Sequence, residues 1–230
     1  MALEFILLLI AAYLIGSIPM AYLVVKYRYG VDIRRYGSHQ SGATNLFRNF
    51  SKLWGLLVFF IDAGKGILLV WITSQLGMGI AQQVAVGIAV VVGHNWPIFL
   101  HFNAGRGLAT TIGVAFFLLP VSIPGFLFCA LFTLILGNSP LPLLVAVASL
   151  PITSALIGKP LELTLGLTLL FLMMVIRRLT APKNERSRLV STRELLVNRL
   201  FFDRDIKDGK AWMTFKPTED SPDHPRKKAK

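Results

Sequence analysis

The chain has 230 residues, of which 54% are hydrophobic and only 16% are charged. An ordinary soluble domain carries about 25% charged residues, so this composition excludes a soluble protein that covers its surface with polar groups. The net charge of +12 is also found in nucleic-acid-binding proteins, but here the basic residues flank apolar segments. We therefore expect them to face anionic lipid headgroups, with no nucleic acid as a partner. The single cysteine, Cys129, excludes a disulfide framework and a cysteine metal site.

Long apolar stretches recur along the chain and predict transmembrane helices. They cover residues 2–25, 53–73, 79–99, 107–136 and 140–176. A membrane-spanning helix needs about 20 residues, so the last two stretches are too long for one crossing each.

Both of these long stretches contain residues that break helices. The last one is interrupted at 158–160 by Gly-Lys-Pro, a turn signal that includes a charge. The fourth is interrupted by Pro120 and Pro124. The helices expected in this half of the chain are 107–119, 125–136, 140–157 and 161–176.

The placement of the basic residues determines how many helices cross. One basic cluster follows the first stretch, and residues 177–230 hold 15 of the 24 Lys and Arg. Basic loops stay in the cytoplasm, and both regions lie there only if the fourth stretch crosses twice. The sequence thus predicts an all-α integral membrane protein with about seven transmembrane helices, two of them short. Its N-terminus is expected outside and its basic C-terminal tail in the cytoplasm.

Composition divides the chain into three regions. Residues 1–176 form the predicted transmembrane domain, and residues 177–216 a basic cytoplasmic extension in which charged and apolar residues alternate. Residues 217–230 are polar and are expected to be disordered. No internal repeat is visible, which argues against a transporter built from inverted halves.

The polar loop at 37–48 is the first candidate site. It reads Gly-Ser-His-Gln-Ser-Gly-Ala-Thr-Asn-Leu-Phe-Arg. Small residues such as Gly42 let backbone N–H groups turn toward an anion. The side chains that add hydrogen bonds or charge are Ser38, Thr44, Asn45 and Arg48. The alternative is a flexible polar loop beside a basic cluster.

Two charged residues lie within the second apolar stretch. Asp62 and Lys65 are spaced i, i+3 and therefore share one face of a helix. Each charge near the middle of a membrane costs about 2.5–3.5 kcal/mol. The pair is either a mutually neutralising structural element or part of a site that faces a substrate cavity.

The third candidate site follows the third apolar stretch. Gly105-Arg106-Gly107 precedes a predicted helix and offers backbone N–H groups, with Arg106 as a countercharge for a phosphate. His94 ends the preceding helix and is a candidate general base beside this loop. The alternative is a polar residue at the membrane interface. Because all three sites suit anions and are predicted on one membrane face, together they indicate a phosphate-handling site.

In their order and spacing, these motifs resemble the bacterial acyl-phosphate:glycerol-3-phosphate acyltransferases, the PlsY family. The first family motif, GSGNxGATNxxR, is matched by Gly37, Ser38, Gly42, Ala43, Thr44, Asn45 and Arg48. The second, DxxKG, is matched by Asp62, Lys65 and Gly66. The next, GHxxPxxxxFKGGKGVAT, is matched by Gly93, His94, Pro97, Phe102, Gly105, Gly107, Ala109 and Thr110. The GSIP sequence at 16–19 also fits.

The resemblance implies a seven-span enzyme of the bacterial inner membrane. Its partners would be glycerol 3-phosphate, acyl phosphate and membrane lipids, and it would transfer the acyl group to the 1-hydroxyl without a metal or other cofactor. The resemblance assigns catalytic roles to His94, Ser38, Arg48 and Asn45. The residues expected to bind phosphate or substrate are Gly42, Thr44, Asp62, Lys65, Gly105, Arg106 and Gly107.

The sequence also departs from the family pattern. His39-Gln40 stands where the family has Gly-Asn, and Asn103 and Arg106 replace two lysines. The HRxNxxRL motif after the last span is reduced to Arg177-Arg178. Two alternatives therefore stay open: a related lipid-headgroup acyltransferase with a different acceptor, and a non-catalytic paralogue or small anion permease. The sequence gives no oligomeric state.

Overall fold

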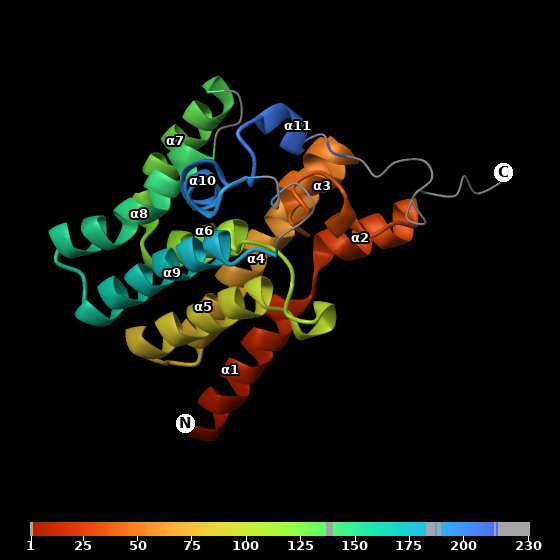
Figure 1. Ribbon diagram of the computed structural model, residues 1–230. Helices are drawn as coiled ribbons and strands as arrows, with labels where there is room; N and C mark the ends of the chain where they lie inside the picture. The colour runs from red at the N-terminus through yellow and green to blue at the C-terminus, as the bar shows by residue number, and fades with distance from the viewer. Residues whose placement is uncertain (1, 137–139, 183–186, 188–189, 214, 216–230) are drawn as a thin grey trace.

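A computed structural model of the chain describes residues 2–136, 140–182, 187, 190–213 and 215, and within these ranges every regular element is a helix. The helices form an elongated bundle, with the N-terminus at one end and a cluster of short helices at another (Figure 1). The bundle helices are α1 (Ala2–Ser17), α2 (Met20–Tyr29), α4 (Lys52–Gln75), α5 (Ile80–Asn95), α6 (Leu108–Leu118), α7 (Ile123–Ile135), α8 (Leu141–Leu156) and α9 (Leu161–Leu179).

The predicted breaks in the two long stretches are present. The fourth stretch is divided by a short 3₁₀ turn, Pro120–Ser122, between α6 and α7. Pro124 lies in the first turn of α7, where its missing N–H costs no helical hydrogen bond. The turn at 158–160 separates α8 from α9, and Gly158 adopts the left-handed conformation there with φ of +68°.

The first apolar stretch contains a break that the sequence analysis missed. It was expected as one span over 2–25, but α1 ends at Ser17 and α2 begins at Met20. Pro19 has no N–H, and the residue before a proline is disfavoured in helical conformation. The carbonyl of Ile18 consequently leaves the helical pattern and accepts a bond from the side chain of Lys65 at 2.6 Å.

Glycines bring two helix pairs into close contact. Helix α1 packs on α5, and α4 packs on α6. A Cβ on Gly93 would collide with the backbone carbonyl of Tyr13, and one on Gly113 would collide with that of Ala63. Small residues at such crossings are characteristic of membrane helices, which associate by close packing.

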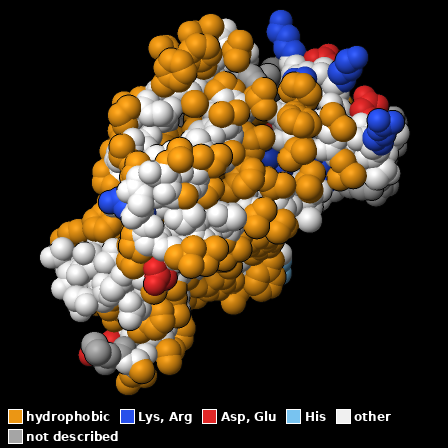
Figure 2. Space-filling model, turned by 90° about the vertical axis from the view of Figure 1, so that its left-hand side faces the viewer, with side chains coloured by type: hydrophobic (Ala, Val, Ile, Leu, Met, Phe, Trp, Pro, Cys, Tyr) orange, Lys and Arg blue, Asp and Glu red, His pale blue; other side chains and the backbone are white. Residues whose placement is uncertain are grey.

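The outside of the bundle is largely apolar. Hydrophobic side chains cover much of the face shown in Figure 2, whereas most of the lysines and arginines visible there gather at one end. Within the described part of the chain, three helical stretches are long and apolar enough to cross a membrane: Ala2–Tyr29, Lys52–Gln75 and Ile80–Leu100. Helices α6 and α8, and the stretch Pro120–Thr133, are apolar but shorter. Of the seven expected segments, the first contains two α-helices and each of the other six contains one, and seven crossings stay a prediction.

The segment after α9 folds back onto the bundle. It contains α10 (Thr192–Val197), a π-helical turn (Asn198–Phe202) and α11 (Gly209–Met213). The π-helical turn packs against α8 and α9, and α11 packs against α3 (Ala43–Asn49). We call residues 191–213, together with Phe215, the C-terminal strap. The predicted disordered tail, 217–230, lies outside the described residues.

Candidate active site

The buried charges of α4 form a network with the break between α1 and α2. Lys65 Nζ lies 2.8 Å from Asp62 Oδ1 and donates to the carbonyl of Ile18. Both charged side chains are buried, so each provides the other with a countercharge where water cannot. The two charges thus neutralise one another, and a role of Asp62 and Lys65 in binding substrate stays a prediction.

His94 lies beside that network at the end of α5. Its Nδ1 is 3.8 Å from Asp62 Oδ1, just beyond hydrogen-bond distance. Its Nε2 faces the backbone of Gly105, where a Cβ would collide with it. Among the described residues, neither ring nitrogen has a hydrogen-bond partner. Nε2 therefore points at the predicted phosphate loop, and Asp62 is the acid nearest to Nδ1.

The loop from α5 to α6 carries backbone strain. His101 and Phe102 are consecutive non-glycine residues with φ of +52° and +59°. Such conformations cost on the order of 1–3 kcal/mol each and concentrate at functional sites. Arg34 reaches this loop from the 3₁₀ turn Ile33–Arg35, which precedes the first polar loop, and donates to the carbonyl of Leu100 at 3.5 Å.

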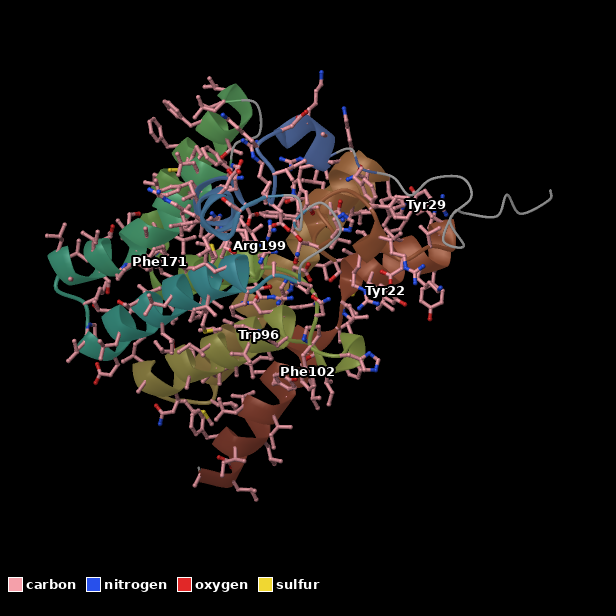
Figure 3. The ribbon with its side chains drawn as sticks, in the orientation of Figure 1. Tyr22, Tyr29, Trp96, Phe102, Phe171 and Arg199 are labelled. Atoms are coloured by element: carbon pink, nitrogen blue, oxygen red, sulfur yellow. The ribbon has the colours of Figure 1, made fainter. Side chains whose placement is uncertain are left out.

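Arg177 fastens the same loop from the end of α9. It donates to the carbonyl of Gly105 at 3.1 Å, to that of Ala104 at 3.2 Å and to Asn103 Oδ1 at 3.1 Å. Its guanidinium also lies over the ring of Trp96, which is labelled in Figure 3. A lysine at 103, the family residue, would place a second positive charge against Arg177. The neutral Asn103 avoids this repulsion and accepts a hydrogen bond from Arg177.

Gly107 closes the phosphate loop. It precedes α6 with φ of +70°, and a Cβ there would strike the side chain of Asn95. Asn95 is fully buried, and both polar atoms of its amide lack a partner in the described residues. Sequence reasoning missed Asn95, although its position next to His94 was a signal that it faces the same loop.

In the first polar loop, the side chain of Asn45 forms hydrogen bonds with several backbone groups. Its amide nitrogen is within 3.2 Å of the carbonyls of Ile33, Tyr36 and Gln40, and its Oδ1 accepts from the backbone N–H of Ser38 at 3.4 Å. These contacts hold the loop around the start of α3. Gly42 precedes α3 as its N-cap, and Thr44 is exposed on it. Asn45 therefore positions Ser38 through the loop.

Arginines and one carboxylate meet where the strap covers the bundle. Arg106 forms an ion pair with Asp203, and Arg178 Nε lies 3.5 Å from Asp203 Oδ1. Burial lowers the pKa of Arg48, which still exposes part of its side chain, and the charge of Asp203 opposes that shift. Arg48, Arg106 and Arg178 thus surround one anionic group. This is the most cationic place among the described residues near His94.

Comparison with known proteins shows the family of this chain. A family model described as glycerol-3-phosphate acyltransferase matches residues 6–190. The chain belongs to this family. Glycerol-3-phosphate acyltransferase 5 of Dehalococcoides mccartyi is 43% identical over 231 aligned positions, covering 96% of this chain and 99% of that protein. Glycerol-3-phosphate acyltransferase 2 of Moorella thermoacetica is 48% identical over 118 positions, which is 51% of this chain and 60% of that protein.

Solved structures of the family share the fold. The crystal structure of PlsY, an integral membrane glycerol 3-phosphate acyltransferase, in its glycerol 3-phosphate form matches with a TM-score of 0.72 and 29% identity. The match covers 86% of this chain and 95% of PlsY. The lysophosphatidic acid form matches with a TM-score of 0.69 and 27% identity. With its apolar helices, this chain is an all-helical integral membrane protein of the acyltransferase family.

The structure places the predicted residues in three groups. One group contains His94, Gly105 and Gly107, with the Asp62–Lys65 pair beside His94. A second group contains Arg106 and Arg48, which both interact electrostatically with Asp203. Ser38 and Asn45 lie in the loop that the strap touches. The sequence analysis missed Arg178 and Asp203. Arg178 was named only as part of the reduced HRxNxxRL motif and was given no role, and Asp203 lies 97 residues along the chain from Arg106.

Proposed function

We propose that this chain transfers a fatty acyl group from acyl phosphate to the 1-hydroxyl of glycerol 3-phosphate, forming lysophosphatidate and phosphate. The observation that carries the proposal is the contact of His94 Nε2 with Gly105, next to Arg106, in a chain of the glycerol-3-phosphate acyltransferase family. A general base beside a phosphate loop is the arrangement that this reaction needs.

Phosphate binding belongs to Arg48, Arg106 and the backbone of Gly105–Gly107. Guanidinium groups bind phosphate oxygens with two parallel hydrogen bonds, which fix orientation as well as charge. The glycines let the substrate approach the backbone closely. Arg177 holds the loop in place through the carbonyls of residues 104 and 105.

The chemical step needs no covalent enzyme intermediate, because an acyl phosphate is already an activated donor. The acceptor oxygen forms a bond to the acyl carbon, and the bond from that carbon to the phosphate oxygen breaks with its electron pair leaving on phosphate. The hydroxyl proton passes to His94 Nε2 or to an oxygen of the substrate phosphate. Positive charge near the acyl oxygen stabilises the tetrahedral intermediate.

The remaining predicted residues position these groups. Asn45 organises the first loop so that Ser38 faces substrate, with Gly42 and Thr44 at the start of α3. Asp62 and Lys65 support His94 and the break between α1 and α2. Each acts through packing and hydrogen bonds that keep the reacting groups in register.

We place the protein in the bacterial inner membrane with seven crossings, the N-terminus outside and the strap in the cytoplasm. The acyl chain lies between helices, open to lipid. Single cysteines test this in a Cys129→Ser background: a membrane-impermeant maleimide is expected to label Lys159→Cys from outside intact cells, and Asp208→Cys only after lysis. The opposite labelling contradicts this orientation.

The activity is tested with purified protein in vesicles, given acyl phosphate and glycerol 3-phosphate, by measuring lysophosphatidate and released phosphate. His94→Ala is expected to lower kcat by about 10²–10⁴-fold, and Arg106→Ala to raise the KM for glycerol 3-phosphate. Near-full activity of His94→Ala contradicts the general-base assignment, and an unchanged KM in Arg106→Ala contradicts the phosphate assignment. Turnover only with another polyol phosphate points to a different acceptor, and no phosphate release with any of them rules out the enzyme.

A further inference from the structure

The C-terminal strap places a carboxylate in the predicted phosphate-binding site. Asp203 is ion-paired with Arg106, whose Nη1 also donates to the Asp203 carbonyl at 3.0 Å. On its other side, Arg178 Nε lies 3.5 Å from Asp203 Oδ1, and Arg178 Nη1 donates to the carbonyl of Leu200 at 2.9 Å. The strap thus contacts both guanidinium groups through its backbone and through one acid.

The carboxylate does not satisfy this site. Arg106 Nε, Arg178 Nε and Asp203 Oδ1 are buried, and none of them has a hydrogen-bond partner in the described part of the chain. The side chain of Arg178 is only 3% exposed, so water is a poor substitute. A phosphate group offers three oxygens where a carboxylate offers two, so the site holds more donors than Asp203 uses.

The strap is fastened on both sides of Asp203. Arg199, labelled in Figure 3, pairs with Asp205 at 2.8 Å and donates to the carbonyl of Leu179 at 2.9 Å, which ties the strap to the end of α9. At the other end, the rings of Trp212 and Phe215 lie 5.6 and 5.1 Å from that of His39. The strap therefore spans from α9 to the first polar loop.

Asp203 occupies the strained point between these two attachments. It has φ of +57°, in the left-handed region that favours glycine. The strap could turn there with a glycine and no acid, yet an acid stands at the turn, against two arginines. The contact of Asp203 with the arginines is strained and incompletely hydrogen-bonded, although the strap is held on both sides of it. An anion that makes more hydrogen bonds to the arginines should therefore displace it.

We propose that Asp203 is a resident anion that occupies the phosphate-binding site of the unliganded protein, and that a phosphate substrate binds by displacing it. The inference rests on the proposed function for the identity of the substrate. What it states physically is that Asp203 and a phosphate group compete for Arg106 and Arg178. The strap then sets the affinity for phosphate, because only the fraction of molecules with Asp203 displaced can bind. The opposing possibility is that Asp203 is a fixed counterion that orients Arg106.

The test measures dissociation constants of the purified full-length protein in detergent, without acyl donor, for inorganic phosphate and for glycerol 3-phosphate. Asp203→Asn is expected to lower both by about fivefold. Asp208→Asn is the matched control: it removes the same charge from the same strap, at a residue that accepts from the backbone N–H groups of residues 210 and 211. Its constants are expected to stay within about twofold of wild type.

Asp203→Gly is the second variant, because glycine suits the backbone at this position and protects against misfolding. It is expected to tighten phosphate binding as Asp203→Asn does. Unchanged or weaker binding in either variant, or an equal gain in Asp208→Asn, overturns the proposal.

Hydrogen exchange separates displacement from simple charge removal. Saturating phosphate is expected to speed exchange of residues 198–208 in the wild-type protein at least twofold, although ligands usually slow exchange. Slower or unchanged exchange in this segment overturns the proposal. Tighter phosphate binding without acyl transfer in any variant defeats the proposed function and leaves this inference intact. If the protein transfers acyl groups but Asp203→Asn binds phosphate as the wild type does, this inference fails and the proposed function stands.

Discussion

The two sides of the candidate site are built differently. On the side of His94, the groups fit one another without room to spare: Gly105 lies against the imidazole, Gly107 against Asn95, and Lys65 against Asp62 and Ile18. On the side of Arg106, the unpartnered buried atoms within the described ranges belong to charged groups, Arg106, Arg178 and the strap's own Asp203, whereas those on the side of His94 belong to the neutral amide of Asn95.

This difference separates parts that hold geometry from parts that exchange ligands. A close-packed network tolerates no change of shape, so substitutions there should lower stability or kcat. An incompletely satisfied charged site should change affinity instead. The following variants test the division, beginning with the largest effect.

The buried ion pair of α4 should give the largest loss of stability. Lys65→Met leaves Asp62 buried without a countercharge and removes the bond to Ile18. We expect it to lower the free energy of unfolding by about 3–5 kcal/mol, measured by denaturant unfolding in detergent. The double variant Asp62→Asn with Lys65→Met should recover part of the loss. A double variant less stable than Lys65→Met would mean that the charges do not act as a pair.

Gly105→Ala should lower kcat by about 100-fold, because the new Cβ displaces His94 Nε2 or the loop by about an ångström. Steady-state acyl transfer in vesicles measures it, with the KM for glycerol 3-phosphate. The control is Gly64→Ala, since a Cβ there meets nothing within 4 Å. Equal activity of the two variants would contradict the close contact.

Arg199→Met should release the strap and leave the bundle folded. Losing a buried ion pair with Asp205 lowers the free energy of local opening, and proteolytic cleavage within residues 191–213 should become about tenfold faster. Timed proteolysis followed by mass spectrometry measures this. Arg193→Met, at an exposed position of α10, is the control. Cleavage within α4 or α5 at the same rate would show that the whole protein had opened.

His39→Gly should have the smallest effect. It relieves a left-handed conformation with φ of +57° but loses the ring contacts with Trp212 and Phe215 and the contact of His39 Nδ1 with the carbonyl of Arg34 at 3.1 Å. These contributions are each about 1 kcal/mol and oppose one another, so stability should change by less than about 1 kcal/mol. His101→Gly, which relieves a similar strain without a described ring contact, should be the more stable of the two. The reverse order would show that the strap gains nothing from His39.

Much of the helical framework is predictable from the sequence, because long apolar runs and proline or glycine breaks are local signals. The turns at 120–122 and 158–160 follow from Pro120 and from the Gly-Lys-Pro sequence. The break at Pro19 was missed because the apolar run continues across it, and the use that the fold makes of it, the bond from Lys65 to the freed carbonyl of Ile18, is not a local signal.

The candidate site is predictable only in part. His94, Gly105 and Arg106 were found because their spacing is local and resembles a family motif. The role of Asn45 toward substrate stays a prediction, and the sequence did not predict that its amide nitrogen bonds the carbonyls of Ile33, Tyr36 and Gln40. The contacts of the strap could not be predicted, because a pattern of alternating charges does not show which residues pair. Asp203 lies beside Arg106 and Arg178 only in the folded chain. The left-handed backbone at His39 explains why the family motif has glycine there.

The most direct test is an experimental structure of the full chain with bound glycerol 3-phosphate. We expect its phosphate oxygens within about 3.2 Å of the Arg106 guanidinium, with the 1-hydroxyl directed to His94 Nε2 and Asp203 moved away from Arg178. A phosphate bound elsewhere, with the contacts of Asp203 to Arg106 and Arg178 intact, would contradict both the site and the role of the strap.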